Sequence, residues 1–288
     1  RVLTMINQML DLKSSAKVNL TLDITGKLDN GYHTLETIFY EVPIYDTLAI
    51  MIDNTRNIDV QCITKSKYEV IPSNENNIAY ISAKKFLEAI DDTSHGVSIG
   101  ILKNIPSQAG LGGGSSNSAC VLKSLNRMFG NPLSTDDLIK LGATIGADVP
   151  FFIMGGTVYA TGIGDILTPL RPLPRLNMVI AKNLDGVSTP QAYKQIDALD
   201  TIQHLNTSLA LKSIENQDIL TLSKCCGNVF EQITLPKSIT DIKNTMLNHN
   251  AMCSVMTGSG SAVFGIFETS ALAKQCFDVL NVPSKFLV

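Results

Sequence analysis

The chain has 288 residues, of which 44% are hydrophobic and 17% charged, and its formal net charge is −3 with no basic run. This composition is ordinary for a globular protein of one large or two modest domains, and it excludes a nucleic-acid surface or an electrostatic attachment to anionic membranes. No stretch approaches the roughly 20 apolar residues of a membrane helix. The opening Arg1 to Met5 is not followed by the long apolar region of a signal peptide.

The cysteines and histidines do not predict a metal site. The six cysteines are scattered without a C-x-x-C pair, and the four histidines supply no matching ligands. Free thiols in a reducing cytosol are therefore expected. We expect a cytoplasmic protein without a dedicated metal.

Alternating residues predict that the chain begins with strands. Apolar residues at 18, 20, 22 and 24 alternate with polar ones, which predicts a strand with one buried face and with Lys17 and Asn19 on its polar face. A turn signal at 29–31 (D-N-G) separates this strand from the next. Similar patterns predict further strands near 48–52, 58–62 and 97–101, and a helix over 77–90.

Two helices are predicted in the middle of the chain. One opens directly after a glycine-rich run that ends at Ser116. The second is announced by Ser134 and Asp137, which stand in a capping-box pattern. It is expected to end before Pro150, because proline disfavours helical geometry at the preceding residue, and a strand is expected after Asp148.

The second half of the sequence has fewer clear signals for the ends of helices and strands. Mixed strands and helices without regular alternation predict the α+β class. The segment 155–174, rich in glycine and proline, is the expected boundary between two lobes. Strands are predicted at 178–181, 254–256 and 263–267, and helices at 239–247 and 272–280.

The glycine-rich run predicts a phosphate-binding site. Four glycines lie between Gly110 and Gly114, after a strand and at the start of a helix. Backbone N–H groups without side chains and the positive end of a helix dipole both suit a phosphate chain. A single glycine would indicate only a tight turn, whereas several at a helix start favour the anion site.

The run matches none of three common nucleotide motifs. No lysine follows the glycines, as a P-loop requires, and the spacing fails the dinucleotide fingerprint G-x-G-x-x-G. The H-R-D and D-F-G motifs of protein kinases do not occur, nor does the nucleophile motif G-x-S-x-G. A different nucleotide-binding loop is therefore indicated.

Asp148 and Lys17 are the candidate catalytic residues. Asp148 lies among apolar neighbours, where a carboxylate needs partners, although an isolated aspartate is more often a helix cap or a turn residue. Lys17 alone would be a surface lysine. Together with a phosphate site they are the parts that phosphoryl transfer requires, since the carboxylate can accept a hydroxyl proton and the ammonium can stabilise negative charge.

Three segments resemble the signature motifs of the GHMP kinases, a superfamily of small-molecule kinases. Residues 106–116 resemble the motif P-x-x-x-G-L-G-G-G-S-S, residues 15–20 resemble the first motif, and residues 257–262 resemble the third. The motifs occur in the expected order along nearly the whole chain. Within the superfamily, Gly31-Tyr32-His33 and the run 146–150 (G-A-D-V-P) resemble the branch that phosphorylates a cytidine diphosphate-linked alcohol of isoprenoid precursor synthesis.

The resemblance implies a two-lobed α+β fold with the active site in the cleft between the lobes. The N-terminal nucleotide-binding lobe would comprise residues 1–160 and 282–288, and a C-terminal lobe of antiparallel sheet and helices would comprise residues 161–281. The final residues would return to the first lobe. The protein would be a monomer or weak homodimer.

The resemblance also assigns roles to residues. Asp148 would be the general base and Lys17 its electrostatic partner. ATP, which brings Mg²⁺ with it, would bind Pro106, Gly110, Leu111, Gly112, Gly113, Gly114, Ser115 and Ser116. The substrate would bind Asn19, Tyr32, His33, Thr189, Tyr193, Gly258, Ser259 and Gly260.

In that branch two aromatic side chains sandwich the cytosine, here Tyr32 and Tyr193, and His33 reads its edge. The branch usually has an arginine-proline-aspartate run before G-Y-H, where this chain has Leu28-Asp29-Asn30. Without the resemblance, His33 would be a hairpin histidine bonded to backbone and Tyr193 a helix-packing residue. Two alternatives stay open. One is another GHMP kinase, of the homoserine or mevalonate type, and the other is a non-catalytic GHMP-like binding protein.

Overall fold

The computed structural model describes residues 9–64 and 71–288, so the expectation about Arg1 to Met5 lies outside the described residues. The chain divides into two compact units by its contacts. Of the described residues, the first comprises those up to Ala16 together with those within Pro43–Ser107 and Gly112–Gly155. The second comprises Lys17–Val42, Gln108–Leu111 and Gly156–Val288. Among the described residues, no helix has the length and apolar character needed to cross a bilayer.

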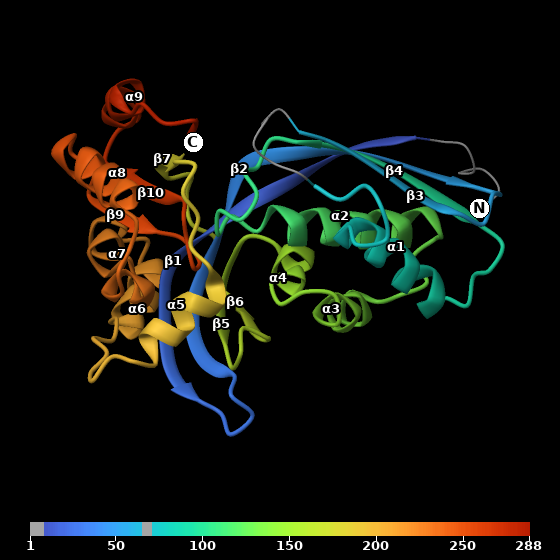
Figure 1. Cartoon of the computed structure of the whole chain (residues 1–288), viewed down its shortest axis with the longest axis horizontal. Coiled ribbons are helices and arrows are strands. Elements are labelled where there is room, and N and C mark those ends of the chain that lie inside the picture. The colour runs from blue at the N-terminus through green and yellow to red at the C-terminus, as the bar shows by residue number, and fades with distance from the viewer. Residues whose placement is uncertain (1–8, 65–70) are drawn as a thin grey trace. The chain divides into compact units, whose positions relative to one another are not determined.

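The secondary structure can be followed along the chain in Figure 1. Two long strands, β1 (Leu10–Lys27) and β2 (His33–Asp53), contribute residues to both units. The first unit also contains β3 (Ile58–Thr64), α1 (Ile78–Ala89), β4 (Gly96–Lys103), α2 (Gly113–Met128), α3 (Thr135–Ala143) and α4 (Val149–Met154). The second unit contains β5 (Thr157–Thr161), β6 (Ile166–Pro169), β7 (Asn177–Lys182), α5 (Thr189–Ile196), α6 (Thr207–Glu215), α7 (Ile219–Cys225), β8 (Gly227–Asn228), the 3₁₀ turn η2 (Val229–Gln232), α8 (Lys237–Asn248), β9 (Cys253–Met256), β10 (Val263–Phe267), α9 (Ser270–Val279) and β11 (Ser284–Leu287).

The first unit is a sheet with helices packed beneath it, as Figure 1 shows. Strand β2 pairs antiparallel with β4, from Thr47 opposite Leu102 to Asp53 opposite Gly96, and β3 pairs parallel with β4. Helix α1 begins where the side chain of Asn77 accepts a hydrogen bond from the Ala79 N–H. Its apolar residues recur at helical spacing and are buried. Helix α2 is buried along most of its length.

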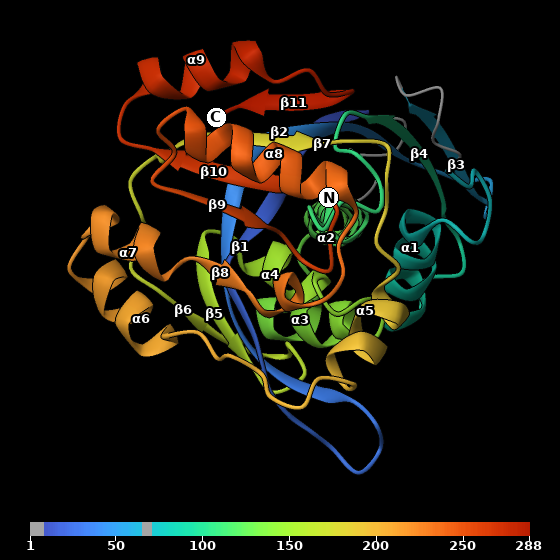
Figure 2. The same cartoon turned by 60° about the vertical axis from the view of Figure 1, so that its left-hand side comes forward.

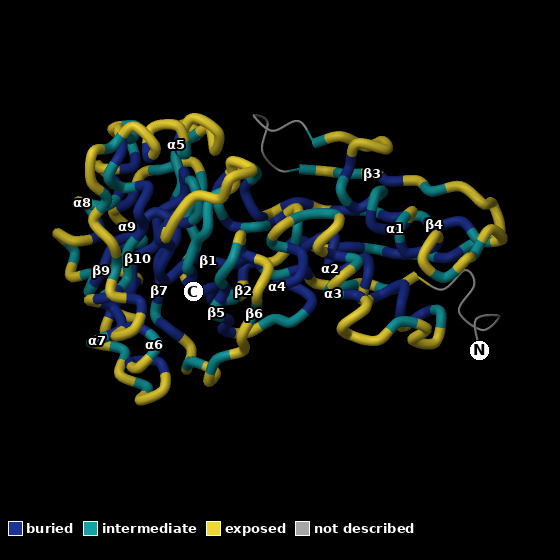
Figure 3. Tube along the Cα trace, turned by 90° about the horizontal axis from the view of Figure 1, so that it is seen from below, coloured by how far each residue is buried: buried dark blue, intermediate teal, exposed yellow. Residues whose placement is uncertain are grey.

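The core of the second unit is a four-stranded antiparallel sheet in the order β11-β7-β10-β9, with α8 and α9 packed against it (Figure 2). Strands β7 and β10 are apolar and buried along most of their length (Figure 3) because both faces of the sheet are covered. Phe230, Met256 and Phe267 belong to one hydrophobic cluster with residues of α8 and α9. This packing fixes the ends of β9 and β10, between which residues 257–262 form a loop.

Several predicted elements are confirmed. The capping box of Ser134 and Asp137 begins α3, and β10 spans the predicted residues 263–267. Strands β7 and β9 and helices α1, α8 and α9 lie within a few residues of their predicted positions. The chain also turns between β1 and β2 at Gly31, where φ is +87°.

Two local predictions were wrong. Residues after Asp148 form helix α4 and not a strand, because Pro150 stands in the first turn, where its missing N–H has no helical partner to lose. The segment 155–174 is not a plain boundary loop, since it contains the β5–β6 hairpin, which pairs with Thr37–Tyr40 of β2. The first unit does end at Gly155.

The C-terminal segment also differs from expectation. Residues 282–288 were expected to join the N-terminal lobe, but β11 pairs with β7 in the sheet of the second unit. The pattern of a four-residue strand does not indicate its partner. The contact-based units also follow borders other than the expected lobes 1–160 and 161–281, because Lys17–Val42 pack with the second unit.

Candidate active site

Helix α2 begins as a phosphate-binding helix would. Its N-cap is Gly112, whose φ of +70° lies in the left-handed region and which offers no side chain to cap the helix. The first-turn N–H groups of a helix have no intrahelical acceptors, and the helix dipole makes that end positive. Gly114 is exposed and Ser115 half-buried at this end. An anion could therefore bind here through backbone N–H groups.

The other residues of the glycine-rich run have structural contacts. Leu111 is buried, and its carbonyl accepts a hydrogen bond from the Lys17 N–H at 3.0 Å. Pro106 is also buried. Ser116 is 3% exposed, and its Oγ lies 2.6 Å from the Oγ of Ser14. Ser116 is thus directed into the first unit and Gly113 is buried, while Gly112, Gly114 and Ser115 form the accessible end of the helix.

Two glycine-containing loops pack on each other within the second unit. A Cβ on Gly110 would lie 2.0 Å from the carbonyl oxygen of Thr257, and Gly110 has φ +74°. The Oγ1 of Thr257 donates to the carbonyl of Gly110 at 3.3 Å, and the Ala262 N–H donates to the carbonyl of Ala109 at 3.1 Å. Only glycine fits this approach at Gly110.

The loop after β9 also contains Gly258, Ser259 and Gly260. Both glycines have positive φ, of +60° and +103°. The Oγ of Ser259 lies 2.6 Å from the Oγ1 of Thr189, at the start of α5. Three of the predicted substrate residues are thereby joined to Thr189, and each of them belongs to the second unit.

Lys17 is buried and not on a polar surface. Its side chain is 3% exposed, its Nζ donates to Asn19 Oδ1 at 2.7 Å, and it lies 5.2 Å above the ring of Phe39. The predicted strand is confirmed as part of β1, but its predicted polar face was wrong, because residues 16–24 are all buried. A buried ammonium needs such partners to remain charged.

Asn19 connects Lys17 to the loop after β9. Its Oδ1 accepts hydrogen bonds from Lys17, from the Gly258 N–H at 3.0 Å and from Thr257 Oγ1 at 3.1 Å. Its Nδ2 donates to Thr37 Oγ1 at 2.7 Å. Asn19 is 2% exposed. Its amide therefore holds Lys17 and the loop in one hydrogen-bond network.

Asp148 is half-buried at the start of α4. It occupies the N-cap position, but its side chain makes no capping hydrogen bond. The alternative role of a helix cap is therefore not supported. Asp148 belongs to the first unit and Lys17 to the second, and their pairing stays a prediction.

The predicted base-binding residues belong to the second unit. Tyr32 is 62% exposed, at the turn between β1 and β2. The ring of His33 stacks on that of Tyr193, with centroids 4.7 Å apart, and Tyr193 meets Phe230 edge-on at 5.0 Å. The structure thus brings His33 and Tyr193 together and leaves Tyr32 open to solvent.

Asp197 was not anticipated from the sequence. It lies at the C-cap of α5, with Oδ1 2.6 Å from His33 Nε2 and Oδ2 2.5 Å from Lys27 Nζ. The hydrogen bonds from Lys27 and His33 lower the pKa of Asp197. Since an ionised carboxylate only accepts, the Nε2 of His33 donates to it. No short-range sequence pattern links residues 33 and 197, so this pair could not be predicted from local signals.

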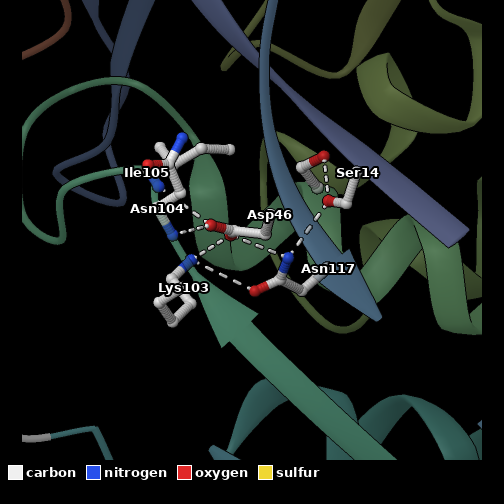
Figure 4. A network of polar contacts seen from close by, with 7 residues as sticks. Ser14, Asp46, Lys103, Asn104, Ile105 and Asn117 are labelled. Carbon is white, nitrogen blue, oxygen red and sulfur yellow. Dashed lines mark hydrogen bonds and ion pairs between the residues drawn. The ribbon is translucent and has the colours of Figure 1, made fainter. Parts of the chain in front are cut away.

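A buried polar network in the first unit was also missed (Figure 4). Asp46 of β2 is fully buried and forms an ion pair with Lys103. A signal was present, because Asp46 stands in the alternation of Ile44, Leu48 and Ile50 at a position that points inward.

Among the described residues, no group of three or more metal-ligating side chains converges on one point. The accessible N–H groups at the α2 N-terminus fit the phosphates of ATP. Magnesium bound to a nucleotide can be held mainly by phosphates and water.

Two family models match the parts of the chain that contain the two glycine loops. The GHMP kinases N terminal domain matches residues 77–156, and the GHMP kinases C terminal domain matches residues 210–281. The fold and the glycine loops are thus those of a GHMP kinase.

Full-length relatives narrow the class. A 4-diphosphocytidyl-2-C-methyl-D-erythritol kinase of Alkaliphilus metalliredigens is 41% identical over 282 residues, covering 96% of this chain and 94% of the relative. The kinase of the same name from Caldicellulosiruptor saccharolyticus is 42% identical over 279 residues, with the same coverage. A crystal structure of 4-(cytidine 5'-diphospho)-2C-methyl-D-erythritol kinase superposes with a TM-score of 0.78 at 29% identity, covering 96% of this chain and 98% of that one. The chain belongs to the 4-diphosphocytidyl-2-C-methyl-D-erythritol kinase family.

Proposed function

We propose that this protein transfers the γ-phosphoryl group of ATP to the 2-hydroxyl of 4-diphosphocytidyl-2-C-methyl-D-erythritol, in the non-mevalonate pathway to isoprenoid precursors. The observation that carries the proposal is the N-terminus of α2, which follows a left-handed Gly112 and has no side-chain cap. Such an end binds phosphates through backbone N–H groups. The choice of the cytidine-linked alcohol as substrate is supported by the relatives, which are named as kinases of this compound.

ATP would bind with its phosphates at Gly112 to Ser115. When bound with the nucleotide, Mg²⁺ would neutralise phosphate charge. Pro106, Gly110, Leu111 and Ser116 would support this site from within the protein, because three of them are buried and Gly110 is packed on Thr257. The loop is therefore shaped before the nucleotide arrives.

Asp148 would act as the general base. It would take the proton of the 2-hydroxyl as that oxygen attacks the γ-phosphorus and the bond to the ADP oxygen breaks. Its support is the resemblance of the run 146–150 (G-A-D-V-P) to the motif of this kinase branch, together with its half-buried place at the start of α4. Lys17 would place positive charge near the reacting groups, held by Asn19 at 2.7 Å.

The cytosine would stack on Tyr32, whose ring is exposed. Tyr193 and His33 would form the other side of the base site. Thr189, Gly258, Ser259 and Gly260 would line the substrate site, and Asn19 would orient the substrate indirectly through the Gly258 N–H.

The test is ADP release from Mg²⁺-ATP with the cytidine-linked alcohol, beside homoserine and mevalonate as acceptors. Proteins that act on those alcohols share the fold, with TM-scores of 0.72 and 0.74. Turnover on the cytidine-linked alcohol alone is expected. Turnover on another alcohol would overturn the proposed substrate, and none with any acceptor would favour a binding protein.

The compartment and the assembly are part of the same proposal. The six cysteines are free thiols, which suits the reducing cytoplasm. A monomer or weak homodimer is expected, and light scattering at two concentrations would distinguish them.

A further inference from the structure

The buried network around Asp46 joins the two chain segments that flank the glycine-rich loop. Asp46 Oδ1 accepts the backbone N–H groups of Asn104 at 2.7 Å and Ile105 at 2.8 Å, just before the loop. Its Oδ2 accepts from Lys103 and, at 3.0 Å, from Nδ2 of Asn117 on α2, just after the loop. One carboxylate on β2 thus holds the entrance and the exit of the loop, as Figure 4 shows.

Asn117 extends the network to the start of α2. Its Oδ1 accepts from Lys103 at 3.2 Å, and its Nδ2 also donates to Ser14 Oγ at 3.0 Å. Ser14 in turn is hydrogen-bonded to Ser116. Asn117 and Ser14 are both buried. All the hydrogen bonds of this network join residues of the first unit.

The first residue of α2 rests directly on this network. A Cβ on Gly113 would lie 3.0 Å from Lys103 Nζ and 2.9 Å from Ile105 Cγ2. A bare ammonium there would oppose the positive end of the helix dipole. The carboxylate of Asp46 balances that charge while it also accepts backbone N–H groups.

We infer that Asp46 is a positioning residue for nucleotide binding, which acts through Lys103 and Asn117 to fix the α2 N-terminus against the strand ends. It does not touch the nucleotide. The first-turn N–H groups bind phosphate well only if their directions are fixed beforehand, because a pre-organised site loses less conformational entropy when the ligand binds. This inference rests on the proposed use of ATP.

The experiment compares ATP affinity with thermal stability in the full chain, without any acceptor alcohol. Asn117→Ala removes the link to α2 but keeps the Asp46–Lys103 ion pair, so it is the variant expected to fold. Asp46→Asn removes the charge itself. Lys123→Met is the matched control, because Lys123 lies on the same helix and donates to the carbonyl of Phe152 at 2.9 Å, away from the N-terminus.

Calorimetric titration with Mg²⁺-ATP should show Kd raised roughly tenfold in Asn117→Ala and more in Asp46→Asn if that variant folds. Lys123→Met should lower the melting temperature and leave the ATP Kd unchanged. A folded Asn117→Ala protein with the wild-type Kd, or an equal loss of affinity in Lys123→Met, would overturn the inference.

The outcome is separate from that of the proposed reaction. A wild-type protein that binds ATP but does not phosphorylate the cytidine-linked alcohol would overturn the proposed substrate, while the Asn117→Ala result would still decide the role of Asp46. A wild-type protein that does not bind ATP would overturn both.

Discussion

The imidazole of His33 lies on the ring of Tyr193, with the two planes 24° from parallel. Tyr193 is packed in addition against Phe230, whereas Tyr32 is largely exposed. The two tyrosines expected to bind cytosine therefore differ in what else they support. Tyr193 is part of the packing of its unit, and Tyr32 is available for a ligand.

Tyr32→Ala should weaken the binding of the cytidine-linked substrate without destabilising the protein. Loss of one stacked ring costs about 1–3 kcal/mol per base, so KM for this substrate should rise about ten- to hundredfold. Steady-state kinetics should show KM for ATP unchanged. Tyr193→Ala should raise the same KM and also lower the melting temperature, because the contacts with His33 and Phe230 are lost.

Tyr45→Ala is the control for removal of a partly exposed tyrosine, since Tyr45 lies in the first unit at 38% exposure. It should leave both KM values unchanged. If Tyr32→Ala raised KM for ATP and for the cytidine-linked substrate by the same factor, the proposed stacking role of Tyr32 would be contradicted.

Asp148→Asn should abolish turnover and retain ATP binding. The amide keeps the shape of the side chain but cannot accept the proton, and general-base catalysis contributes roughly 10²–10⁴-fold. ADP release should fall by at least the lower of these factors, while calorimetry should give the wild-type Kd for ATP. Asp136→Asn, at an exposed position of helix α3, is a matched control that should not change the rate. Near-normal turnover in Asp148→Asn would falsify the assigned base.

Gly110→Ala should destabilise the protein far more than Gly130→Ala. Both glycines have positive φ, of +74° and +84°, so both substitutions strain the backbone. Only at Gly110 does the new Cβ meet the backbone of Thr257, whereas nothing lies within 4 Å at Gly130. We expect a loss of about 1 kcal/mol at Gly130 and several kcal/mol at Gly110, measured by urea unfolding. Equal losses would show that the contact with Thr257 contributes nothing.

Asp197 should make part of the stability depend on acid pH. Its pKa is lower in the folded protein because Lys27 and His33 donate to it. A carboxyl with a depressed folded pKa adds stability that is complete above its unfolded pKa, about 3.9, and is lost as the pH falls through the folded pKa. The difference in melting temperature between wild type and Asp197→Asn should therefore be present at pH 6 and shrink toward pH 3. A difference that stays constant down to pH 3 would argue against this assignment.

Elements with local signals could be predicted from the sequence. Ser134 and Asp137 identify the start of α3 because a capping box is formed by residues three apart. Helix α4 was missed because Pro150 was interpreted as a stop, although proline also suits the first turn of a helix. Helices α6 and α7 begin at the N-cap residues Asn206 and Asp218, and these cap residues could have predicted the starts of both helices from the sequence.

The site was only partly predictable, because its residues depend on distant segments. The glycine-rich start of α2 is local, and the sequence identified it. The burial of Lys17 is not local, since Asn19 beside it is bonded to Thr257 and Gly258, far along the chain. An alternating pattern shows which residues of a strand share a face. It does not show which other segments of the protein cover each face.

The close packing of Gly110 on Thr257 has a consequence for the inheritance of these loops. The two segments lie 147 positions apart in the chain, yet their backbones leave no space for even one methyl group between them. A change in the path of either loop must be matched by the other. A chimera that takes residues 106–116 from a distant homoserine kinase should therefore fold only when residues 257–262 come from the same donor, so that recombination treats the two loops as a single module.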